Sequence, residues 1–303
     1  MAGVITTGNH PKALWPGIHA WWGRKYDEHP EEYSQIFDVT TSDKNYEEDV
    51  EATGFGLAPV KSQGDAVQYD SETQGATKRY VHIVYGLGYI VTREELEDNK
   101  YEVVSKQRSQ ALAFSVRQTE ETVCANVMNR AFNSSYTGAD GKEMIATDHP
   151  TINGTQSNKL AVAADLSEAS IEDLCIQIGT ALNSRGHKIK LMPQALIIPP
   201  QEMFNATRIL KSVQQSGTAN NDVNALKAMG MFPKGIIVNH YFTDSDAWFI
   251  KTNAPNGLRR FNRRATEFKQ DNDFDTENAK AKSTLRFSVG WTDWRAMYGS
   301  AGA

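Results

Sequence analysis

Apolar and polar residues alternate along two long stretches of the chain. In the run YVHIVYGLGYIVT, six apolar residues occupy every second position: Val81, Ile83, Tyr85, Leu87, Tyr89 and Val91. Near the end, four do the same: Leu285, Phe287, Val289 and Trp291. A period of two is typical of β-strands. We therefore predict a long β-hairpin over residues 53–91 with its tip near residues 71–75, and two further strands in LRRFNRRATEFKQ and STLRFSVGW.

A long helix is predicted between these strand regions. Residues 101–132 contain neither Pro nor Gly, and a partial apolar stripe runs along an otherwise polar body: Val104, Leu112, Val116, Val123, Val127 and Phe132. At 1.5 Å per residue such a helix is roughly 45 Å long. The capping-box pattern Thr92–Glu95 predicts a short helix just before it. A helix polar over most of its circumference is expected to be covered on one side only.

The second half of the chain mixes helices and strands. Ser170 is the expected cap of a helix whose apolar residues keep helical spacing and which closes at Gly186. QALII, GIIVNHYF and DAWFIKT read as strands, PPQEMFNATRILKS and DVNALKAM as helices, and VQQSGTANND as a polar loop. The predicted fold class is therefore α+β, with a compact mixed unit over residues 160–252.

The first fifty residues hold seven aromatic side chains without a sustained period: Trp15, Trp21, Trp22, Tyr26, Tyr33, Phe37 and Tyr46. We interpret this segment as an arm and not as a domain. Disordered tails are poor in aromatics, because such side chains bury large apolar areas once they find a surface. That surface is either a neighbouring molecule or the core of the same chain, and the pattern alone leaves both open.

Charge and composition narrow the functional classes. The 303 residues include 32 Lys plus Arg and 37 Asp plus Glu, a net charge of −5, which disfavours tight non-specific DNA binding. No apolar run reaches the roughly 18 residues of a membrane span, and the start lacks a signal-peptide pattern. We expect a cytoplasmic protein that binds no membrane. The two cysteines, Cys124 and Cys175, suffice for neither a disulfide framework nor a zinc site.

Few residues suggest catalysis or a cofactor. Asp148 and His149 are adjacent and could polarise an imidazole, but their turn-rich surroundings contain no recognisable nucleophile. The remaining histidines are isolated, and Gly54–Gly56 and Gly86–Gly88 are only fragments of phosphate-binding patterns. We therefore expect no catalytic residue, no cofactor and no metal.

One dense basic cluster consists of Arg259, Arg260, Arg263 and Arg264. Guanidinium groups suit bidentate contacts with phosphate or carboxylate. Nucleic-acid binding is one interpretation of the cluster. Salt bridging to acidic segments of the same or a neighbouring subunit, such as YDEHPEE and YEEDVE, is the other and is favoured.

The order of these elements resembles the major capsid proteins of tailed bacteriophages with the Hong Kong 97-type fold, and within them the Mu-like major head subunits. Four segments of this chain carry the resemblance, which spans nearly the whole sequence: LWPGIHAWWGRKYDEHPEEYSQIFDV, YVHIVYGLGYIVTREELEDN followed by the long helix, SIEDLCIQIGTALNSRG followed by QALIIPPQEMF, and STLRFSVGWTDWRAMYG. Each segment alone is weakly specific, so their order carries the comparison.

The resemblance implies a division of the chain into five parts. Residues 1–52 correspond to an N-terminal arm, 53–91 to an extended loop lying over the adjacent subunit, and 92–159 to the peripheral domain with its spine helix. Residues 160–252 correspond to the axial domain, and 253–303 to peripheral-domain strands and the C-terminal return. Some members of the family crosslink through a Lys and an Asn. Residues 71–75 contain no lysine, so no crosslink is expected here.

The implied function is a structural one, without catalysis. Copies of the chain would form hexamers and pentamers of an icosahedral shell that is assembled in the bacterial cytoplasm, becomes the virion capsid, and encloses double-stranded DNA without sequence-specific binding. A separate scaffolding protein, a portal and a decoration protein are the further partners that the resemblance suggests. Nine residues are expected at contacts between subunits: Trp15, Trp21, Trp22, Tyr26, Tyr69, Arg259, Arg260, Arg263 and Arg264.

Two alternatives stay open. An encapsulin-like shell of the same fold would enclose enzymes instead of a genome. A hydrolase using Asp148 and His149 is the second alternative, from a different functional class. Under the capsid interpretation, removal of residues 1–48 is expected to leave a soluble protein that does not assemble.

Overall fold

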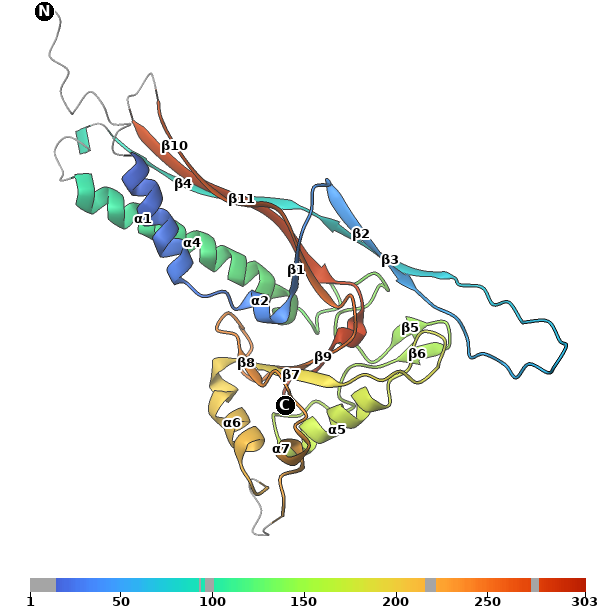
Figure 1. Cartoon of the computed structure of the whole chain (residues 1–303). Helices are drawn as coiled ribbons and strands as arrows, with labels where there is room; N and C mark the ends of the chain where they lie inside the picture. Colours follow the sequence, from blue (N-terminus) through green and yellow to red (C-terminus); the bar gives the residue numbers. More distant parts are fainter. Residues whose placement is uncertain (1–14, 93, 96–100, 216–221, 274–277) are drawn as a thin grey trace, which may run out of the picture.

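The chain forms two sheet-and-helix layers joined at one side, with a hairpin that projects beyond both (Figure 1). The computed structural model describes residues 15–92, 94–95, 101–215, 222–273 and 278–303, and within these the side chains other than those of 15–19, 21, 52 and 101–105. A single core cluster connects the layers, because Ile197 and Phe249 of the smaller sheet lie in the same cluster as Phe287 of the larger one. This mixed arrangement confirms the predicted α+β class.

The larger sheet contains the longest strands. Its order is β1 (Asp38–Thr41), β10 (Leu258–Asn272), β11 (Ala279–Trp291) and β4 (Ile83–Val91), with β1 parallel to β10 and the other pairs antiparallel. The predicted alternation in β11 is confirmed as far as Phe287, since Leu285 and Phe287 are buried and Arg286 between them is half-buried. Beyond Phe287 it is lost, because Ser288, Gly290 and Trp291 are all buried. In β4 only part of the predicted face is covered: Tyr85, Tyr89 and Val91 pack on the core, whereas Ile83 and Leu87 are exposed.

Three helices cover one face of this sheet. The long α4 (Tyr101–Asn129) packs on β11 and β4, and α1 (Trp15–Glu28) packs along α4 (Figure 1). The four-residue α2 (Tyr33–Ile36) links α1 to β1. The predicted long helix is therefore confirmed, ending at Asn129. Of the short helix predicted before it, Glu94 and Glu95 are described and helical, and Thr92 Oγ1 accepts a hydrogen bond from Glu95 N at 3.3 Å.

The arm shows no sustained period in the sequence, yet it forms regular elements in the structure. It contains α1, α2 and β1, and Trp22, Ile36 and Phe37 are buried in the core of the subunit. These elements are hard to see in the sequence, because α2 and β1 are only four residues long and are too short to show a period. The described part of the arm therefore packs back on its own chain.

The hairpin consists of β2 (Tyr46–Ala52) and β3 (Gln74–Val81), connected by the irregular segment 53–73. Ala52 pairs with Gln74, so residues 71–75 form the root of the loop, and the predicted tip there is wrong. At Gly75 a Cβ atom would lie 2.9 Å from the carbonyl oxygen of Glu51, so glycine permits close strand approach and does not mark a turn.

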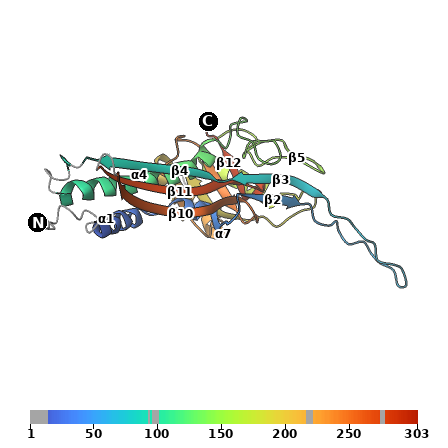
Figure 2. The same ribbon diagram turned by 90° about the horizontal axis from the view of Figure 1, so that it is seen from above.

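The far turn of the loop lies at residues 62–65, where Asp65 N donates to Ser62 O and Gly64 has a φ of 92°. Glycine adopts this backbone conformation at no steric cost. Lys61 adjoins this turn, so the expected absence of a lysine at the tip is also wrong. Figure 2 shows that the loop extends well beyond the body of the subunit.

The smaller sheet has the order β12 (Met297–Ser300), β9 (Trp248–Thr252), β7 (Pro193–Ile198) and β8 (Ile236–Val238). The predicted QALII strand is confirmed as part of β7, whose apolar run is buried on both faces. The remaining elements are the helices α5 (Glu168–Gly179), α6 (Met203–Lys211) and α7 (Ala225–Met229), the 3₁₀ turns η3 (Pro200–Glu202) and η4 (Trp294–Ala296), and the hairpin β5 (His149–Thr151) and β6 (Gly154–Gln156).

The helix predicted to start at Ser170 begins earlier. Ser167 is the N-cap of α5, and Ser170 occupies the third helical position of a capping box, with each serine bonding the backbone of the other. Serine replaces the usual Glu or Gln at that position, which is why the sequence pattern pointed to the wrong serine. The helix also ends at Gly179 and not at Gly186.

Candidate assembly surfaces

Trp22 and Tyr26 attach the arm to the sheet. The Trp22 side chain is 6% exposed, and its ring stacks between those of Tyr26, at 5.0 Å, and Phe268, at 5.4 Å. The Tyr26 hydroxyl lies 3.0 Å from both a Glu120 carboxylate oxygen and Thr266 Oγ1, and burial raises the pKa of Tyr26 to about 12. These two candidate contact residues are therefore used within the subunit. The side chains of Trp15 and Trp21 lie outside the described residues.

Buried charges on α4 hold the other end of the arm. Arg117 donates to Glu31 at 2.8 Å and to Glu120 at 3.0 Å, and its guanidinium lies 3.9 Å from the centre of the Tyr26 ring. Glu121 accepts hydrogen bonds from the backbone N–H groups of Glu32 and Tyr33 at 2.9 and 3.1 Å. Burial raises the pKa of Glu121 to about 7. No sequence pattern indicated these anchors, because polar residues of a helix usually lie on its solvent-exposed face.

The arginine cluster is divided between the interior and the surface. Arg260 is 3% exposed, pairs with Glu120 at 3.5 Å and stacks on the rings of Tyr33 and Phe287 at 3.8 and 4.4 Å. Arg259 forms an ion pair with Asp49 of the same chain at 2.9 Å, as one of the two sequence interpretations expected.

Only the end of the cluster faces outward. Arg264 is exposed and Arg263 is half-buried, with no hydrogen-bond partner for Arg263 Nε among the described residues. The register of β10 against β11 shifts around Arg264, which interrupts the inward and outward alternation there. Arg264 therefore remains a candidate contact between subunits, whereas Arg260 lies inside the protein.

The extended loop presents five large, exposed apolar side chains, two of which are almost fully in solvent. Val60 is 99% exposed and Tyr69 is 96% exposed. Three further members of the set are Phe55, Leu57 and Val67. Monomeric proteins rarely leave contiguous apolar surface of this kind uncovered. The loop is therefore a candidate assembly surface, and Tyr69 lies near its root.

Further apolar side chains are exposed along β3 and β4, which continue from the loop, and together they form an exposed apolar strip on this edge of the sheet: Val81, Ile83, Val84, Leu87 and Ile90. Ile83 and Leu87 lie on one face of β4, and Val84 and Ile90 lie on the other. Beside it, a groove of about 640 Å³ lies between these strands and the C-terminal half of α4, with Lys78, Tyr85, Arg130 and Tyr136 in its lining. His82 separates β3 from β4 and is itself buried, within hydrogen-bond distance of the Ser42 and Ser288 hydroxyls at 3.2 and 3.0 Å.

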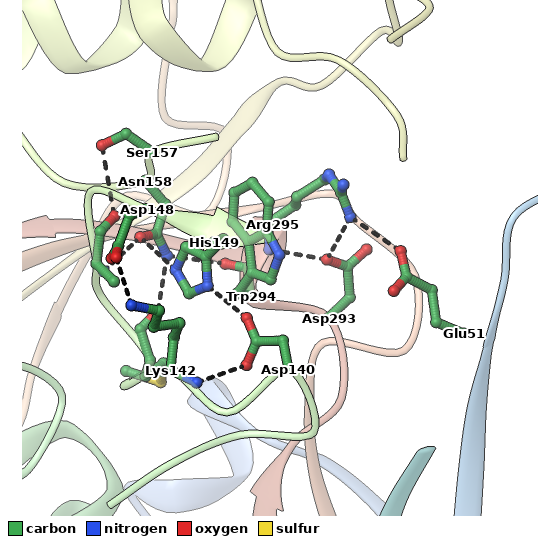
Figure 3. Close-up of polar contacts among 12 residues, drawn as sticks. Glu51, Asp140, Lys142, Asp148, His149, Ser157, Asn158, Asp293, Trp294 and Arg295 are labelled. Carbon is green, nitrogen blue, oxygen red and sulfur yellow. Dashed lines mark hydrogen bonds and ion pairs between the residues drawn. The ribbon is translucent and has the colours of Figure 1, made fainter. Parts of the chain in front are cut away.

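The Asp148–His149 pair that the hydrolase alternative requires does not form. Asp148 is exposed and ion-paired with Lys142, whereas His149 Nδ1 lies 2.6 Å from the Asp140 carboxylate and Nε2 lies 3.0 Å from Asn158 Oδ1 (Figure 3). The imidazole is 0% exposed and stacks on Trp294 at 4.3 Å. A buried ring with both nitrogens engaged has no route to a substrate, so the geometry is that of a structural histidine.

Asn158 links three segments of the chain at this position. Its amide Nδ2 donates to the carbonyl oxygens of Met144, Trp294 and Met297 at 2.7 to 3.2 Å, and its Oδ1 accepts from Ala146 N at 2.9 Å. Such a satisfied buried network fixes the segments relative to one another. The His149 site therefore belongs to the junction between the two sheets.

Arg295 anchors the root of the loop to this junction (Figure 3). Its guanidinium reaches Glu51 at 3.4 Å, Asp293 at 3.3 Å and the carbonyl oxygen of Leu182 at 3.0 Å. Glu51 also accepts a hydrogen bond from Ser184. Burial raises the pKa of the Asp293 carboxyl, and the positive charge of Arg295 counteracts part of this rise. The end of β2 is thereby tied to residues 182–184, a contact that no sequence pattern indicated.

No group of three or more His, Cys, Asp or Glu side chains that could hold a metal ion occurs among the described residues. None of the described helices is both long and apolar enough to cross a lipid bilayer. Cys124 and Cys175 are buried and unpaired, and burial raises the pKa of both thiols to about 12.

The family model of the phage capsid proteins matches residues 75–300. No curated protein matches the chain. Among solved structures, the capsid of an empty GTA particle is similar with a TM-score of 0.57 and 11% identity, covering 91% of both chains. The capsid of cyanophage P-SCSP1u gives a TM-score of 0.55 and 11% identity, covering 89% of this chain and 88% of that one. A virus-like particle from Pyrococcus furiosus is similar with a TM-score of 0.52 and 14% identity, covering 93% of this chain and 97% of that one.

Proposed function

Because the chain belongs to the phage capsid protein family and is a major capsid protein with the Hong Kong 97-type fold, we propose that its copies form the hexamers and pentamers of an icosahedral tailed-phage head around double-stranded DNA. The observation that carries the proposal is the projecting loop, whose apolar side chains find no cover in their own subunit. The Mu-like subfamily stays a prediction.

The proposed assembly uses the loop and the exposed apolar strip as complementary surfaces. Segment 53–73 of one subunit lies on the peripheral domain of its neighbour, and Tyr69 and Arg264 are contacts between subunits. Burial of each large apolar side chain in such a contact contributes about 1.5–3 kcal/mol, so a few of them outweigh the cost of ordering the loop. The division of the chain at residues 52, 91, 159 and 252 is part of this proposal, with residues 15–41 packed on the peripheral domain.

The chain acts as a structural protein without catalysis in this proposal. Its net charge of −5 suits a wall that holds DNA without sequence-specific binding and does not resist packing and release of a polyanion. Assembly in the host cytoplasm, with a separate scaffolding protein, a portal and a decoration protein, completes the proposed pathway. An encapsulin-like cargo shell is not favoured, since the matching family is that of phage capsid proteins.

Electron microscopy of the expressed protein, with and without a scaffolding protein, tests the shell. Closed shells or capsomer rings are expected. A matched variant in which a short Gly-Ser linker replaces residues 57–68 is expected to fold as the parent does and to form no shells. Shells from the linker variant would contradict the role of the loop, and a monomer in every condition would contradict the shell function.

Alanine replacement of both Asp148 and His149 is the obvious test of the hydrolase alternative. His149 lies in the core, so its replacement disturbs folding and the double variant is not a clean test. Asp148→Ala changes an exposed residue and is expected to leave both folding and assembly intact.

A further inference from the structure

The extended loop is held to its own subunit by one arginine at the point where it leaves the body. Arg185 Nη1 donates to the Asp70 carboxylate at 2.7 Å, and Nη2 donates to the carbonyl oxygen of Ser71. The same Asp70 oxygen accepts the backbone N–H of Gly56 at 2.7 Å. Asp70 therefore joins the outgoing and returning halves of the loop, and Arg185 fixes both to the body.

Arg185 itself is positioned by a tight turn. Asn183 Oδ1 accepts the backbone N–H groups of Arg185 and His187 at 3.0 and 2.8 Å, and Gly186 N donates to Asn183 O at 3.0 Å. Gly186 has a φ of 85°, and a Cβ atom there would lie 2.0 Å from Asn153 Nδ2. The arginine thus extends from a rigid support and not from a mobile segment.

Arg295 also stabilises the turn that carries Arg185. Arg295 donates to the carbonyl oxygen of Leu182 and to Ser184 Oγ, and it pairs with Glu51 at the end of β2. Two successive points on the loop root, first Glu51 and then Asp70, are therefore fixed to residues 182–185. Beyond Gly56 and Asp70, side chains such as Val60 extend freely into solvent.

We propose that the Arg185–Asp70 ion pair is a latch that sets the direction of the loop in the free subunit, and that its release lets the loop swing. The inference rests on the proposed role of the loop as the segment that reaches a neighbour. A loop whose direction is already fixed loses less conformational freedom when a neighbour binds it, so the latch accelerates assembly. The Arg185 side chain is 18% exposed and that of Asp70 is 47% exposed, which makes the pair accessible to salt and to a competing carboxylate.

Distance measurements between spin labels test the latch in the unassembled subunit. Labels are placed at Gln63→Cys, near the far turn, and at Asp173→Cys on α5; Cys124 and Cys175 are buried, and the unsubstituted parent reports background labelling. For the otherwise unchanged protein we expect a narrow distance distribution at low salt that broadens at high salt. For the Asp70→Asn and Arg185→Gln variants we expect the broad distribution at both salt concentrations.

Two controls make this outcome specific. Asp65→Asn makes the same chemical change elsewhere in the loop and is expected to keep the narrow distribution. The charge-swapped double variant Asp70→Arg, Arg185→Asp is expected to recover part of it, because only a direct ionic contact is restored by exchange. A distribution for Asp70→Asn that matches the parent at both salt concentrations would overturn the latch.

Assembly kinetics separate this inference from the function on which it rests. Asp70→Asn is expected to assemble about two- to fivefold more slowly than the parent, the size expected of a partly exposed ion pair. If shells form when residues 57–68 are replaced, the proposed function of the loop fails, whatever the labels report. If the loop is required for assembly while the latch variants match the parent in distance and rate, only the latch fails.

Discussion

The aromatic arm and the extended loop look alike in the sequence, yet in the structure the arm is largely buried and the loop is exposed. Both are irregular in pattern and rich in large apolar residues. The arm is buried on its own subunit, with Trp22 stacked on Phe268, whereas the loop leaves Tyr69 in solvent. The difference lies in their polar partners: the arm is tied down by Arg117, Glu120 and Glu121 of α4, and segment 57–69 has no such anchor among the described contacts.

A pair of matched truncations should give the largest effect. Trp22→Ala is expected to lower the free energy of unfolding by about 3–5 kcal/mol, because it leaves a cavity between Tyr26 and Phe268. Tyr69→Ala is expected to change it by less than about 0.5 kcal/mol and to impair assembly instead. Chemical denaturation of the unassembled subunits measures both. Equal losses of stability would show that the loop is folded onto its own subunit in solution.

Replacement of the buried Arg260 should lower the stability of the subunit nearly as much. Arg260→Gln removes the charge that stacks on Tyr33 and faces Glu120, and we expect a loss of about 3 kcal/mol from breaking this buried pair. Arg264→Gln, four residues along the same strand and exposed, serves as the control and should stay within about 0.5 kcal/mol. A shell defect without a stability loss in Arg260→Gln would restore the intersubunit role first expected for this residue.

The attachment of the arm should also depend on pH. Burial raises the pKa of Glu121 to about 7 in the folded protein. Stability from this group is therefore complete below its ordinary pKa, near pH 4.5, and is lost as the pH rises to about 7. We expect the stability of the parent to fall by about 1–3 kcal/mol relative to Glu121→Gln across that interval. Parallel pH profiles for the two proteins would contradict the assignment.

The smallest effect on stability is expected from cutting the loop. Lys61 is the only basic residue between positions 53 and 73, so trypsin cuts the loop once. We expect cleavage at Lys61 under native conditions, before any cleavage at Arg24 or Lys25 of α1, and an unfolding midpoint of the nicked protein equal to that of the intact one. Cleavage in α1 before cleavage at Lys61 would show that the arm is more accessible to the protease than the loop, contrary to the expectation.

Local patterns predicted much of this fold. The long helix, the QALII strand and the two C-terminal strands follow from spacing that each segment carries in itself. The contacts that position the arm and loop could not be predicted in this way, because their partners are far apart: Glu51 meets Arg295 across 244 residues, and Tyr26 meets Thr266 across 240. Charged residues are mostly found at the surface. Arg260 was accordingly expected at a contact between subunits and Glu121 on the polar side of the long helix, but both side chains are buried inside the subunit.

The expected phenotype of an arm deletion changes accordingly. Without residues 1–48 the subunit loses β1, which pairs with β10, and the buried side chains of Trp22 and Phe37. An unfolded protein is therefore expected, instead of a soluble one that fails to assemble. The loop is the segment whose removal separates folding from assembly.

The far turn of the loop, at residues 62–65, takes part in no sheet of the subunit. Folding of the subunit therefore places almost no constraint on the residues of this turn. The constraint on them comes from their fit to a neighbouring copy. We expect these positions to change together with the surface that receives them, independently of the core. The same freedom makes the turn a suitable place to insert a foreign peptide for display on particles, provided that the flanking apolar residues are kept.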